Sequence, residues 1–373
     1  MNVGNIHDCF GCGVCAIACG RKIIDIHLNK EGFYEPYLID EDKCTDCGLC
    51  VDVCSFSHDN YSLKKCITRS YAAWSKNDDV RQFCSSGGVG YEVARTLIKD
   101  GYKVCGVRYD VELNRAEHYI ASNEEELKQS VGSKYIQSYT LDCFRQIKRN
   151  EKYLVVGTPC QIDSFRRYIQ KYKCEDNFVL MDFFCHGVPS KLMWDKYVRK
   201  VEREIGGFSS VAWRCKKTGW HDSWVMSFSK KNKDLVYYSY YTKGDLFYSL
   251  FLGHFCIGKQ CHNNCRFKCE KSSADIRIGD FWGKIYSKDE EGVSAVISLT
   301  EKGDNILNSV ESLVFKPHTI EEVTEGQQKS NAEQHDLRNI VMFAFRHNIF
   351  ISKSVLALLI KLNYKYNRLK RLL

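Results

Sequence analysis

Two copies of one cysteine pattern occupy the beginning of this 373-residue chain. Each copy reads C-x2-C-x2-C-x3-C, and the second follows the first by 35 residues. The eight cysteines are Cys9, Cys12, Cys15, Cys19, Cys44, Cys47, Cys50 and Cys54. Gly11, Gly13 and Gly48 lie between them, where a tightly curled loop needs the backbone freedom of glycine. Such an internal repeat predicts a small domain, of about 60 residues, built on two equivalent thiol loops.

Bacterial ferredoxins bind two 4Fe–4S clusters with this spacing, and the fourth cysteine of each run ligates the other cluster. Three thiolates on one loop reach three corners of a cubane, whereas the fourth points toward the neighbouring cluster. The ligand sets expected by analogy are Cys9, Cys12, Cys15 and Cys54 for one cluster, and Cys44, Cys47, Cys50 and Cys19 for the other. Proline usually follows the fourth cysteine, but Gly20 and Ser55 stand there, so the exit geometry is undetermined. Zinc is the alternative metal.

Composition limits the class of protein. The chain has 44% hydrophobic residues and only 4 prolines, which predicts two or three compact domains without long disordered linkers. Residues 1–10 resemble no secretory signal, and no run of about 18 apolar residues predicts a membrane-spanning helix. We therefore expect a cytoplasmic protein with reduced cysteines. The formal charge of +8 is mostly dispersed, so we expect no nucleic-acid partner.

Beyond residue 62, strand-like and helix-like segments alternate, which predicts helices packed on a sheet. Helices are expected over 88–99, 161–172 and 190–205, the last with Ser190 as its N-cap, and strands over 102–109, 154–156 and 178–184. Two aromatic-rich segments, 224–228 and 236–241, are typical of antiparallel strands. A mixed sheet is therefore expected rather than a purely parallel one.

Three loops between these segments carry candidate chemistry. Residues 157–160 (GTPC) follow a strand and begin a helix, where free N–H groups favour a phosphate and lower a thiol pKa. This loop therefore suits a phosphate, a reactive thiol, a cluster ligand, or simply a capped helix. Residues 185–189 (CHGVP) also end a strand, and residues 84–88 (CSSGG) precede a helix and could hold a phosphate.

A second group of cysteines lies near the end of the predicted sheet domain. Cys256, Cys261, Cys265 and Cys269 give C-x4-C-x3-C-x3-C. Four cysteines within 14 residues indicate a further metal site, with a cluster favoured over zinc. His262 is expected on an exposed part of this loop rather than as a ligand.

An ordered set of motifs resembles the coenzyme F420 hydrogenase/dehydrogenase beta-subunit family, from about residue 1 to residue 300. The motifs are SSGG (85–88), GSKYIQS (132–138), GTPCQI (157–162), CHGVPS (185–190) and SSADIRIGDFWG (272–283), behind the cysteine repeat. The resemblance implies FAD, a further 4Fe–4S cluster, and hydride exchange with a deazaflavin in the best-known members. Cys256, Cys261 and Cys265 match the family's extra-cluster pattern, and the fourth ligand is Cys269, Cys160 or Cys185.

The resemblance also implies which residues line the flavin and substrate cleft. The expected cofactor-binding residues are Ser85, Ser86, Gly87, Gly88, Gly132, Ser133, Lys134, Tyr135, Gly157, Thr158, Pro159, Gln161, Gly187, Asp280, Phe281, Trp282 and Gly283. Cys160 and His186 are the catalytic candidates. His186 would either stabilise charge on reduced flavin or brace the cleft through a backbone hydrogen bond.

The resulting expectation is an α+β protein with three parts. A ferredoxin-like domain with two 4Fe–4S clusters covers residues 1–62, a mixed-sheet flavin and iron–sulfur domain covers 63–335, and a basic amphipathic helical tail covers 336–373. The tail would lie on its own domain, on a partner or on an anionic membrane.

The expected function is an oxidoreductase that converts hydride chemistry at FAD into one-electron transfer through 4Fe–4S clusters. Its redox partner would be a protein such as ferredoxin, or a deazaflavin or nicotinamide nucleotide. The alternatives are an iron–sulfur subunit without flavin activity, or a zinc-containing interaction protein.

Overall fold

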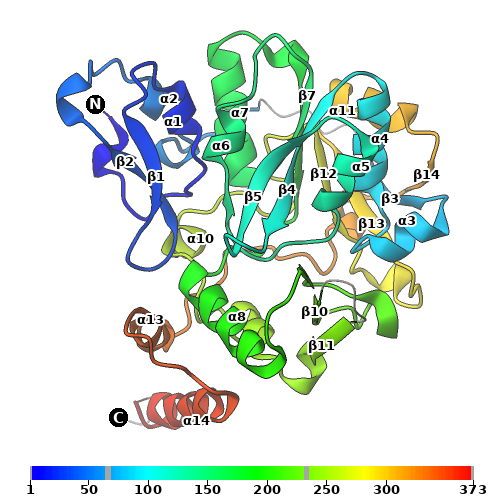
Figure 1. Cartoon of the computed structure of the whole chain (residues 1–373). Coiled ribbons are helices and arrows are strands. Elements are labelled where there is room, and N and C mark those ends of the chain that lie inside the picture. The colour runs from blue at the N-terminus through cyan, green and yellow to red at the C-terminus, as the bar shows by residue number, and fades with distance from the viewer. Residues whose placement is uncertain (1, 64–68, 231–234, 371–373) are drawn as a thin grey trace.

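A computed structural model describes residues 2–63, 69–230 and 235–370, and the side chains outside 235–236 and 366–370. The N-terminal module contains α1 (Val14–Ala18), a hairpin of β1 (Ile24–Leu28) and β2 (Tyr34–Leu38), and α2 (Leu49–Asp52). Both helices begin after a glycine with a left-handed backbone, Gly13 with φ 73° and Gly48 with φ 75°. Glycine is favoured at both positions because other residues are strained there. The module lies beside the large sheet (Figure 1).

Among the described residues, nine strands form the central sheet in the order β14-β3-β13-β12-β8-β7-β4-β5-β6. Their bounds are β3 (Arg69–Ser75), β4 (Lys103–Asp110), β5 (Arg115–Ala121), β6 (Ser138–Tyr139), β7 (Tyr153–Val156), β8 (Phe178–Phe183), β12 (Ile276–Asp280), β13 (Ser294–Ser298) and β14 (Leu313–Pro317). Strands β12, β8, β7 and β4 are mutually parallel, and β3 has the same direction because β13 is antiparallel to both β3 and β12. The carboxyl ends of five strands therefore share one edge of the sheet.

Helices cover both faces of this sheet, because side chains of alternate strand residues point to opposite faces. Leu154 and Val179 pack with α4 (Val89–Lys99) and α11 (Glu301–Ser309) on one face. Val155 and Leu180 pack with α7 (Pro159–Lys171) and α6 (Leu141–Phe144) on the other, where α1 also packs. The remaining short helices are α3 (Asp78–Phe83), α5 (Glu124–Leu127), α12 (Ile320–Val323), η1 (Val3–Asn5), η2 (Glu41–Lys43), η3 (Ser55–Ser57), η4 (Lys128–Ser130), η5 (Glu175–Asn177), η6 (Lys216–Thr218), η7 (Tyr241–Lys243) and η8 (Lys284–Tyr286).

A second unit follows β8 in the chain. Its elements are α8 (Lys191–Ile205), a small antiparallel sheet of β9 (Ser210–Ala212), β10 (Val225–Ser229) and β11 (Leu235–Tyr240), then α9 (Leu246–Leu252) and α10 (Lys259–Asn263). A separate aromatic core, which includes Trp194, Trp213 and Phe247, holds these elements together. Figure 1 shows α8, β10 and β11 together on one side of the large sheet, with α13 (Arg338–Arg346) and α14 (Lys353–Lys370) farther out.

The structure confirms the α+β class and the mixed sheet predicted from the sequence. The predicted helices correspond to α4, α7 and α8, and Ser190 caps α8 by accepting a hydrogen bond from the Leu192 N–H. The predicted helical tail contains two helices: α13 buries Val341 and Met342 in the second core, and α14 follows with Leu356 in the same core. Within the described residues, no helix is long and apolar enough to cross a membrane. Residues 371–373 of the predicted tail lie outside the described residues.

Candidate iron–sulfur and cofactor site

Four thiols surround a small cavity in the N-terminal module. The wall of this cavity contains Cys9, Cys12, Cys15 and Cys54, together with apolar side chains such as Val3, Ile26 and Phe56. The Gly11 N–H donates to Cys9 Sγ over 3.3 Å. Burial raises the pKa of Cys12 to about 11, and the neighbouring Cys54 raises it as well. The fourth cysteine of the second run therefore lies with the first three of the first run.

The other set forms around Cys50. Burial raises the pKa of Cys50, and the charge of Cys19 adds to this effect, so these two thiols are neighbours. Cys44 Sγ accepts a hydrogen bond from Asn2 Nδ2 at 3.5 Å, and Cys47 is exposed. Cys19, from the first run, thus lies with the second run, which is the arrangement that crossed ligation requires.

A third set of thiols is assembled from three distant segments. Burial raises the pKa of Cys160 well above its ordinary value, and Cys185, Cys261 and Cys265 raise it further. The same neighbours act on one another, since Cys265 raises the pKa of both Cys185 and Cys261. Cys160 lies at the start of α7, after β7, and Cys185 lies after β8, so two adjacent parallel strands bring these thiols to one edge. Gly187 also lies here, and a Cβ on it would be 3.5 Å from Cys261 Cβ.

Cys256 and Cys269, predicted as ligands from their spacing, lie elsewhere. Cys256 is fully buried in the second core, its Sγ lies 3.7 Å from the Leu250 carbonyl, and burial raises its pKa to about 12. Cys269 has a left-handed backbone, φ 51°, and its Sγ lies 3.9 Å from the Gln328 carbonyl. His262, expected to be exposed, is buried, and its Nδ1 lies 2.5 Å from the Ala332 carbonyl. Among the described residues, no three His, Cys, Asp or Glu side chains are grouped for a single metal ion.

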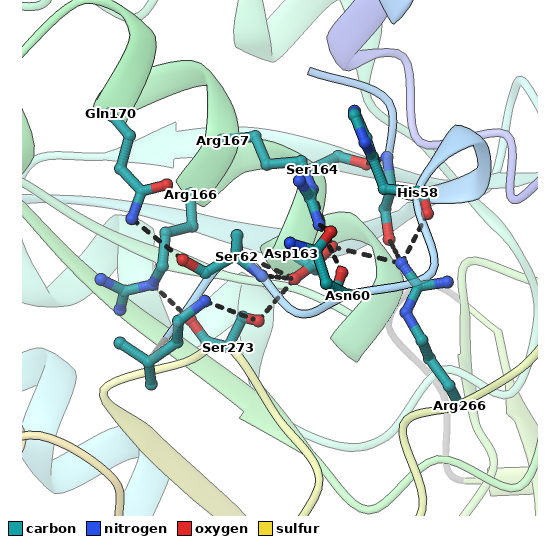
Figure 2. Close-up of polar contacts among 12 residues, drawn as sticks. His58, Asn60, Ser62, Asp163, Ser164, Arg166, Arg167, Gln170, Arg266 and Ser273 are labelled. Atoms are coloured by element: carbon teal, nitrogen blue, oxygen red, sulfur yellow. Dashed lines mark hydrogen bonds and ion pairs between the residues drawn. The ribbon is translucent and has the colours of Figure 1, made fainter. Parts of the chain in front are cut away.

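A buried polar junction connects the N-terminal module to the segment that follows Cys265, and Figure 2 shows the contacts of this junction around Asp163 and Arg266. Arg266, which follows Cys265, donates to the Ser55 carbonyl over 2.6 Å, and Ser55 follows Cys54. The Ser55 N–H donates to Ser164 Oγ on α7 over 2.9 Å. Proline could not make that hydrogen bond, which gives a physical reason for serine at a position where this motif usually has proline.

Asp163 lies at the centre of this junction and is fully buried (Figure 2). Its Oδ1 accepts hydrogen bonds from the Ser62 N–H and Oγ, both at 2.8 Å, and from Ser273 Oγ. Its Oδ2 lies 3.2 Å from Arg167 Nε and 3.6 Å from Arg266 Nη2. Burial alone would raise the pKa of Asp163, but these hydrogen bonds and the Arg167 charge hold it below its ordinary value. A carboxylate thus ties three chain segments together.

The end of the GSKYIQS motif makes a second contact with the module. Gln137 Oε1 accepts the Tyr34 N–H at 2.9 Å, and its Nε2 donates to the Phe10 carbonyl at 3.3 Å. Thr140 Oγ1 donates to the Cys12 carbonyl over 2.9 Å. The first thiol loop therefore rests on the sheet domain through direct hydrogen bonds to its backbone.

The remaining motif loops meet at the carboxyl edge of the sheet. The SSGG loop follows β3 and α3, and Ser85 Oγ accepts the Ser133 N–H of the GSKY loop at 3.0 Å. Ser86 Oγ donates to the Val293 carbonyl, and Gly87 leaves no room for a Cβ between Ala73 and Ser294. Gly88 begins α4 with φ 85°. Two predicted cofactor loops are therefore in contact, although part of SSGG serves packing.

Two lysines lie at these loops. Lys134 Nζ donates to the backbone carbonyls of residues 129–132, and Gly132, with φ 82°, permits that turn. Lys216 Nζ donates to the carbonyls of Arg81 and Ser86. Desolvation lowers the pKa of Lys134 to about 7 and that of Lys216 to about 8, while the charge of Cys84 as a thiolate acts in the opposite direction. Both ammonium groups are thus held by neutral carbonyl oxygens, and Lys216 Nζ also donates to the Glu291 carbonyl, so an anion would have to replace some of these carbonyls.

An aromatic stack covers the DFWG loop. Trp282 stacks on Trp220 at 5.1 Å between ring centroids, and Trp224 stacks on Tyr135 at 5.3 Å. Arg214 lies over Trp224, donates to the Tyr135 hydroxyl and forms a 3.1 Å ion pair with Asp280. The second unit, which supplies Arg214, Trp220 and Trp224, therefore covers the end of β12. Phe281 instead points into the core, and a Cβ on Gly283 would be 2.8 Å from Glu325.

The GTPC loop serves mainly to begin α7. Thr158 and Gln161 form a capping box, in which Gln161 Oε1 accepts the Thr158 N–H at 2.9 Å. Pro159 occupies the first helical turn, where its missing N–H costs nothing. A Cβ on Gly157 would lie 3.0 Å from the Gln161 side chain. The capping box uses the Thr158 N–H, and Thr158 Oγ1 lies 3.2 Å from Cys160 Sγ, so this loop presents the Cys160 thiol at the start of α7.

His186 lies beside the third thiol set. Its Nε2 is 3.0 Å from His254 Nε2, and its ring packs edge-on against Phe251. Burial lowers the pKa of His186 to about 4, and the charges of His254 and Lys268 act in the same direction. A ring with this pKa is uncharged near neutral pH, which suits bracing of the loop better than charge stabilisation.

The sequence motifs did not single out Arg266, Asp163, Lys216 and Arg214. Arg266 lies within the second cysteine cluster, so its position beside a candidate ligand was the available signal. Asp163, Arg214 and Lys216 reach the site only through the tertiary fold, and no local spacing marks them.

Comparison with known proteins identifies two families in the chain. Residues 150–322 match the family model for the C-terminal part of the coenzyme F420 hydrogenase/dehydrogenase beta subunit, and residues 8–57 match a 4Fe–4S dicluster domain. The second match contains all eight cysteines of the repeat. The match to a 4Fe–4S dicluster domain thus precedes the match to the beta-subunit model along the chain.

Two individual proteins resemble the chain over most of its length. The coenzyme F420-dependent sulfite reductase of Methanocaldococcus jannaschii is 30% identical over 320 residues, which are 81% of this chain and 46% of that protein. The chain thus spans about half the length of this curated relative. The F420-reducing NiFe hydrogenase complex of Methanosarcina barkeri contains a chain with a TM-score of 0.48 and 15% identity, covering 78% of this chain and 91% of that one.

Proposed function

This chain belongs to the coenzyme F420 hydrogenase/dehydrogenase beta-subunit family, and we propose that it is a flavin- and iron–sulfur-dependent oxidoreductase. In this proposal, residues 1–62 hold two 4Fe–4S clusters, and the sheet domain holds a third cluster and FAD. The observation that carries the proposal is the short covalent and hydrogen-bonded connection from Cys54 through Ser55 and Arg266 to Cys265. It joins the thiol cavity of the dicluster domain to the thiols beneath the motif loops.

The third cluster is proposed to be ligated by Cys160, Cys185, Cys261 and Cys265, in place of Cys256 and Cys269. The four cysteines are partly buried, and both desolvation and the charges of the neighbouring thiolates raise the pKa values of Cys160 and Cys261. Iron cations remove that cost, because metal binding favours the deprotonated thiolate. The partial burial of these four cysteines and the electrostatic interactions among their thiolates therefore support a cluster at this place.

The flavin is proposed to bind where the SSGG, GSKY and DFWG loops meet. A bound flavin accepts a hydride and releases electrons singly, and each cubane cluster takes one electron, so the cofactors together supply two-to-one electron conversion. Lys134 and Lys216 would hold the anionic diphosphate of FAD by exchanging some of their carbonyl partners for phosphate oxygens, because neither ammonium group is paired with a carboxylate. Arg214 and Trp282 would exclude water from this edge of the sheet.

The electron donor and acceptor are proposed from the relatives and the chemistry. A deazaflavin is one candidate hydride donor, since the curated relative is named for coenzyme F420. A nicotinamide nucleotide is the other, and a ferredoxin-type protein would exchange single electrons at the dicluster domain. More than half of the curated relative lies outside the match, so the proposal is limited to electron transfer.

Anaerobic reduction tests this function. The protein is purified without oxygen, and half is stripped of flavin by mild chaotrope treatment. Reduced deazaflavin, NADH and NADPH are then added separately, and the visible absorbance of the clusters is followed. We expect at least one hydride donor to bleach the clusters of the flavin-loaded protein but not of the stripped protein, whereas dithionite reduces both.

Several outcomes would contradict the proposal. Protein that contains iron but takes up no FAD would be a relay subunit without its own hydride chemistry. Stoichiometric zinc without visible absorbance would indicate an interaction protein. Equal bleaching of loaded and stripped protein by the same donor would show that the electrons do not pass through flavin.

A further inference from the structure

The last tenth of the chain carries its entire net charge. Residues 337–373 contain eight Lys or Arg and no Asp or Glu, while the preceding residues contain 46 of each sign. Arg338 is buried and its charge is neutralised inside the protein, because its Nη2 pairs with Glu31 at 2.7 Å and its Nε donates to the Ile257 carbonyl. Arg346, Lys353, Lys361 and Lys365 are exposed. Helices α13 and α14 therefore carry exposed positive charge and no acidic residue of their own.

Large apolar side chains are exposed on the same two helices. On α14, Val355, Leu358 and Leu362 are 44%, 55% and 53% exposed and follow one another at i, i+3 and i+7. Residues with that spacing lie on one side of a helix and form what we call the apolar stripe. Ile340, Phe343, Ile349 and Phe350, on α13 and the turn after it, are each 45–51% exposed. Exposed apolar residues gathered in this way mark an interaction surface.

The opposite side of α14 is fixed to the protein. Leu356 is buried in the second core, with Leu359 packed against it. Asn363 Nδ2 donates to Asp336 Oδ2 at 3.3 Å, and Lys353 Nζ donates to the Lys243 carbonyl at 3.0 Å. Since Leu356, Leu359 and Asn363 hold one side, the apolar stripe is presented outward, with Lys361 and Lys365 one turn from Leu358 and Leu362. Figure 1 shows α14 as the outermost helix on this side.

We propose that the outer face of α13 and α14 docks on an anionic phospholipid surface. A helix that combines an apolar stripe with basic residues lies in the plane of a bilayer, its apolar side chains among the acyl chains and its cations at the head groups. A second copy of this chain is a poor occupant, because it would place the same acid-free, positive surface against this one. An anionic bilayer provides both acyl chains for the apolar stripe and negative head groups for the lysines.

Vesicle flotation of the full chain tests this proposal. Vesicles of phosphatidylglycerol and phosphatidylcholine in equal parts are compared with vesicles of phosphatidylcholine alone, at low and high salt. We expect the protein to float with the anionic vesicles and to bind them at least about tenfold more tightly than the neutral ones. High salt should weaken the difference, because it screens exposed charges.

Two variants identify the surface. Leu358→Glu/Leu362→Glu should lower binding to anionic vesicles about tenfold or more, because it removes the apolar stripe and adds negative charge. The matched control is Leu28→Glu/Leu113→Glu, which changes two leucines of similar exposure elsewhere and should float like the wild type. Lys361→Ser/Lys365→Ser should weaken binding to anionic vesicles only.

Three results would overturn the proposal. The first is that the wild-type protein stays in the unbound fraction. The second is that the Leu358→Glu/Leu362→Glu variant floats as well as the wild type. The third is that this variant and its control Leu28→Glu/Leu113→Glu lose binding equally. Light scattering on the same samples identifies another occupant: a dimer that the Leu358/Leu362 variant converts to a monomer, with flotation unchanged, would assign this face to self-association.

Discussion

At the scale of single residues, the irregularities of the cysteine motif have local explanations. Ser55 stands where proline usually follows the fourth cysteine, and its N–H and carbonyl are both used in the junction with Ser164 and Arg266. Gly20 occupies the equivalent position after Cys19, and a Cβ there would meet nothing within 4 Å. The two positions therefore differ in what their backbone must do, although the motif treats them alike.

Substituting the usual proline at position 55 and at position 20 tests whether the backbone N–H is needed at one position and not at the other. Ser55→Pro removes the buried hydrogen bond from the Ser55 N–H to Ser164 Oγ, which should destabilise the junction by about 1 kcal/mol. Gly20→Pro should be neutral, since Cys19 already has the extended backbone that precedes proline. The measurement is the urea concentration at which the clusters are lost. Equal effects of both substitutions would refute the role given to the Ser55 N–H.

Because the pKa of Lys134 is lowered, we expect pH to have opposite effects on FAD affinity and on the stability of the folded protein. Its pKa is lowered to about 7 in the folded protein, against about 10.4 when unfolded. It is therefore charged below about pH 7, and FAD affinity should fall as the pH rises from about 6 to about 9. Between the two pKa values only the unfolded chain holds the proton, so the flavin-free protein should become more stable as the pH rises.

Lys134→Met should remove most of both pH effects, as followed by FAD titration and by thermal unfolding. Lys128→Met is the matched control, because Lys128 is exposed and pairs with Glu125 on the same segment. If FAD affinity were the same at all pH values in the wild type, Lys134 would not contact the anionic part of the cofactor.

At the scale of elements, Arg266 and Asp163 join η3, α7 and the second cysteine loop. Arg266→Gln removes the hydrogen bonds to Ser55, and we expect unchanged iron content, an earlier loss of the clusters in urea, and slower electron transfer between flavin and the outer clusters. The matched control is Lys171→Gln. Lys171 pairs with Asp52 across the same boundary at 2.7 Å, but both groups are exposed, so its loss should change neither property.

Stopped-flow reduction of flavin-loaded protein measures the transfer rate for this comparison. If Arg266→Gln slowed reduction no more than Lys171→Gln, the junction would be only a structural contact between the two domains.

Much of the fold at this scale follows from sequence patterns. The apolar periodicity of 88–99 and 190–205 predicts α4 and α8, and the glycines and spacing of the cysteine runs predict their loops. The third thiol set does not follow from spacing. Cys160 and Cys185 are brought together because β7 and β8 are parallel neighbours, and strand order depends on contacts between distant residues. Cys256 and Cys269 have the spacing of ligands, but the second core and a left-handed turn hold them away.

At the scale of the whole molecule, the N-terminal module lies next to the edge of the large sheet at which its parallel strands end. The carboxyl ends of β3, β7, β8 and β12 bring the motif loops together, and the N-terminal module rests on Gln137, Thr140 and α7 beside them. The second unit covers the DFWG loop and carries α13 and α14 outward (Figure 1). We propose that a third cluster, ligated by Cys160, Cys185, Cys261 and Cys265, connects the N-terminal module to the motif loops.

Iron content of anaerobically reconstituted variants tests this claim most directly. With four irons in each cubane, the wild type should contain about 12 irons per chain. Cys160→Ser and Cys185→Ser should each retain about 8 irons, with the dicluster signals unchanged in electron paramagnetic resonance, whereas Cys256→Ser and Cys269→Ser should retain about 12. Loss of about four irons from Cys256→Ser or Cys269→Ser, with Cys160→Ser at the wild-type value, would contradict it.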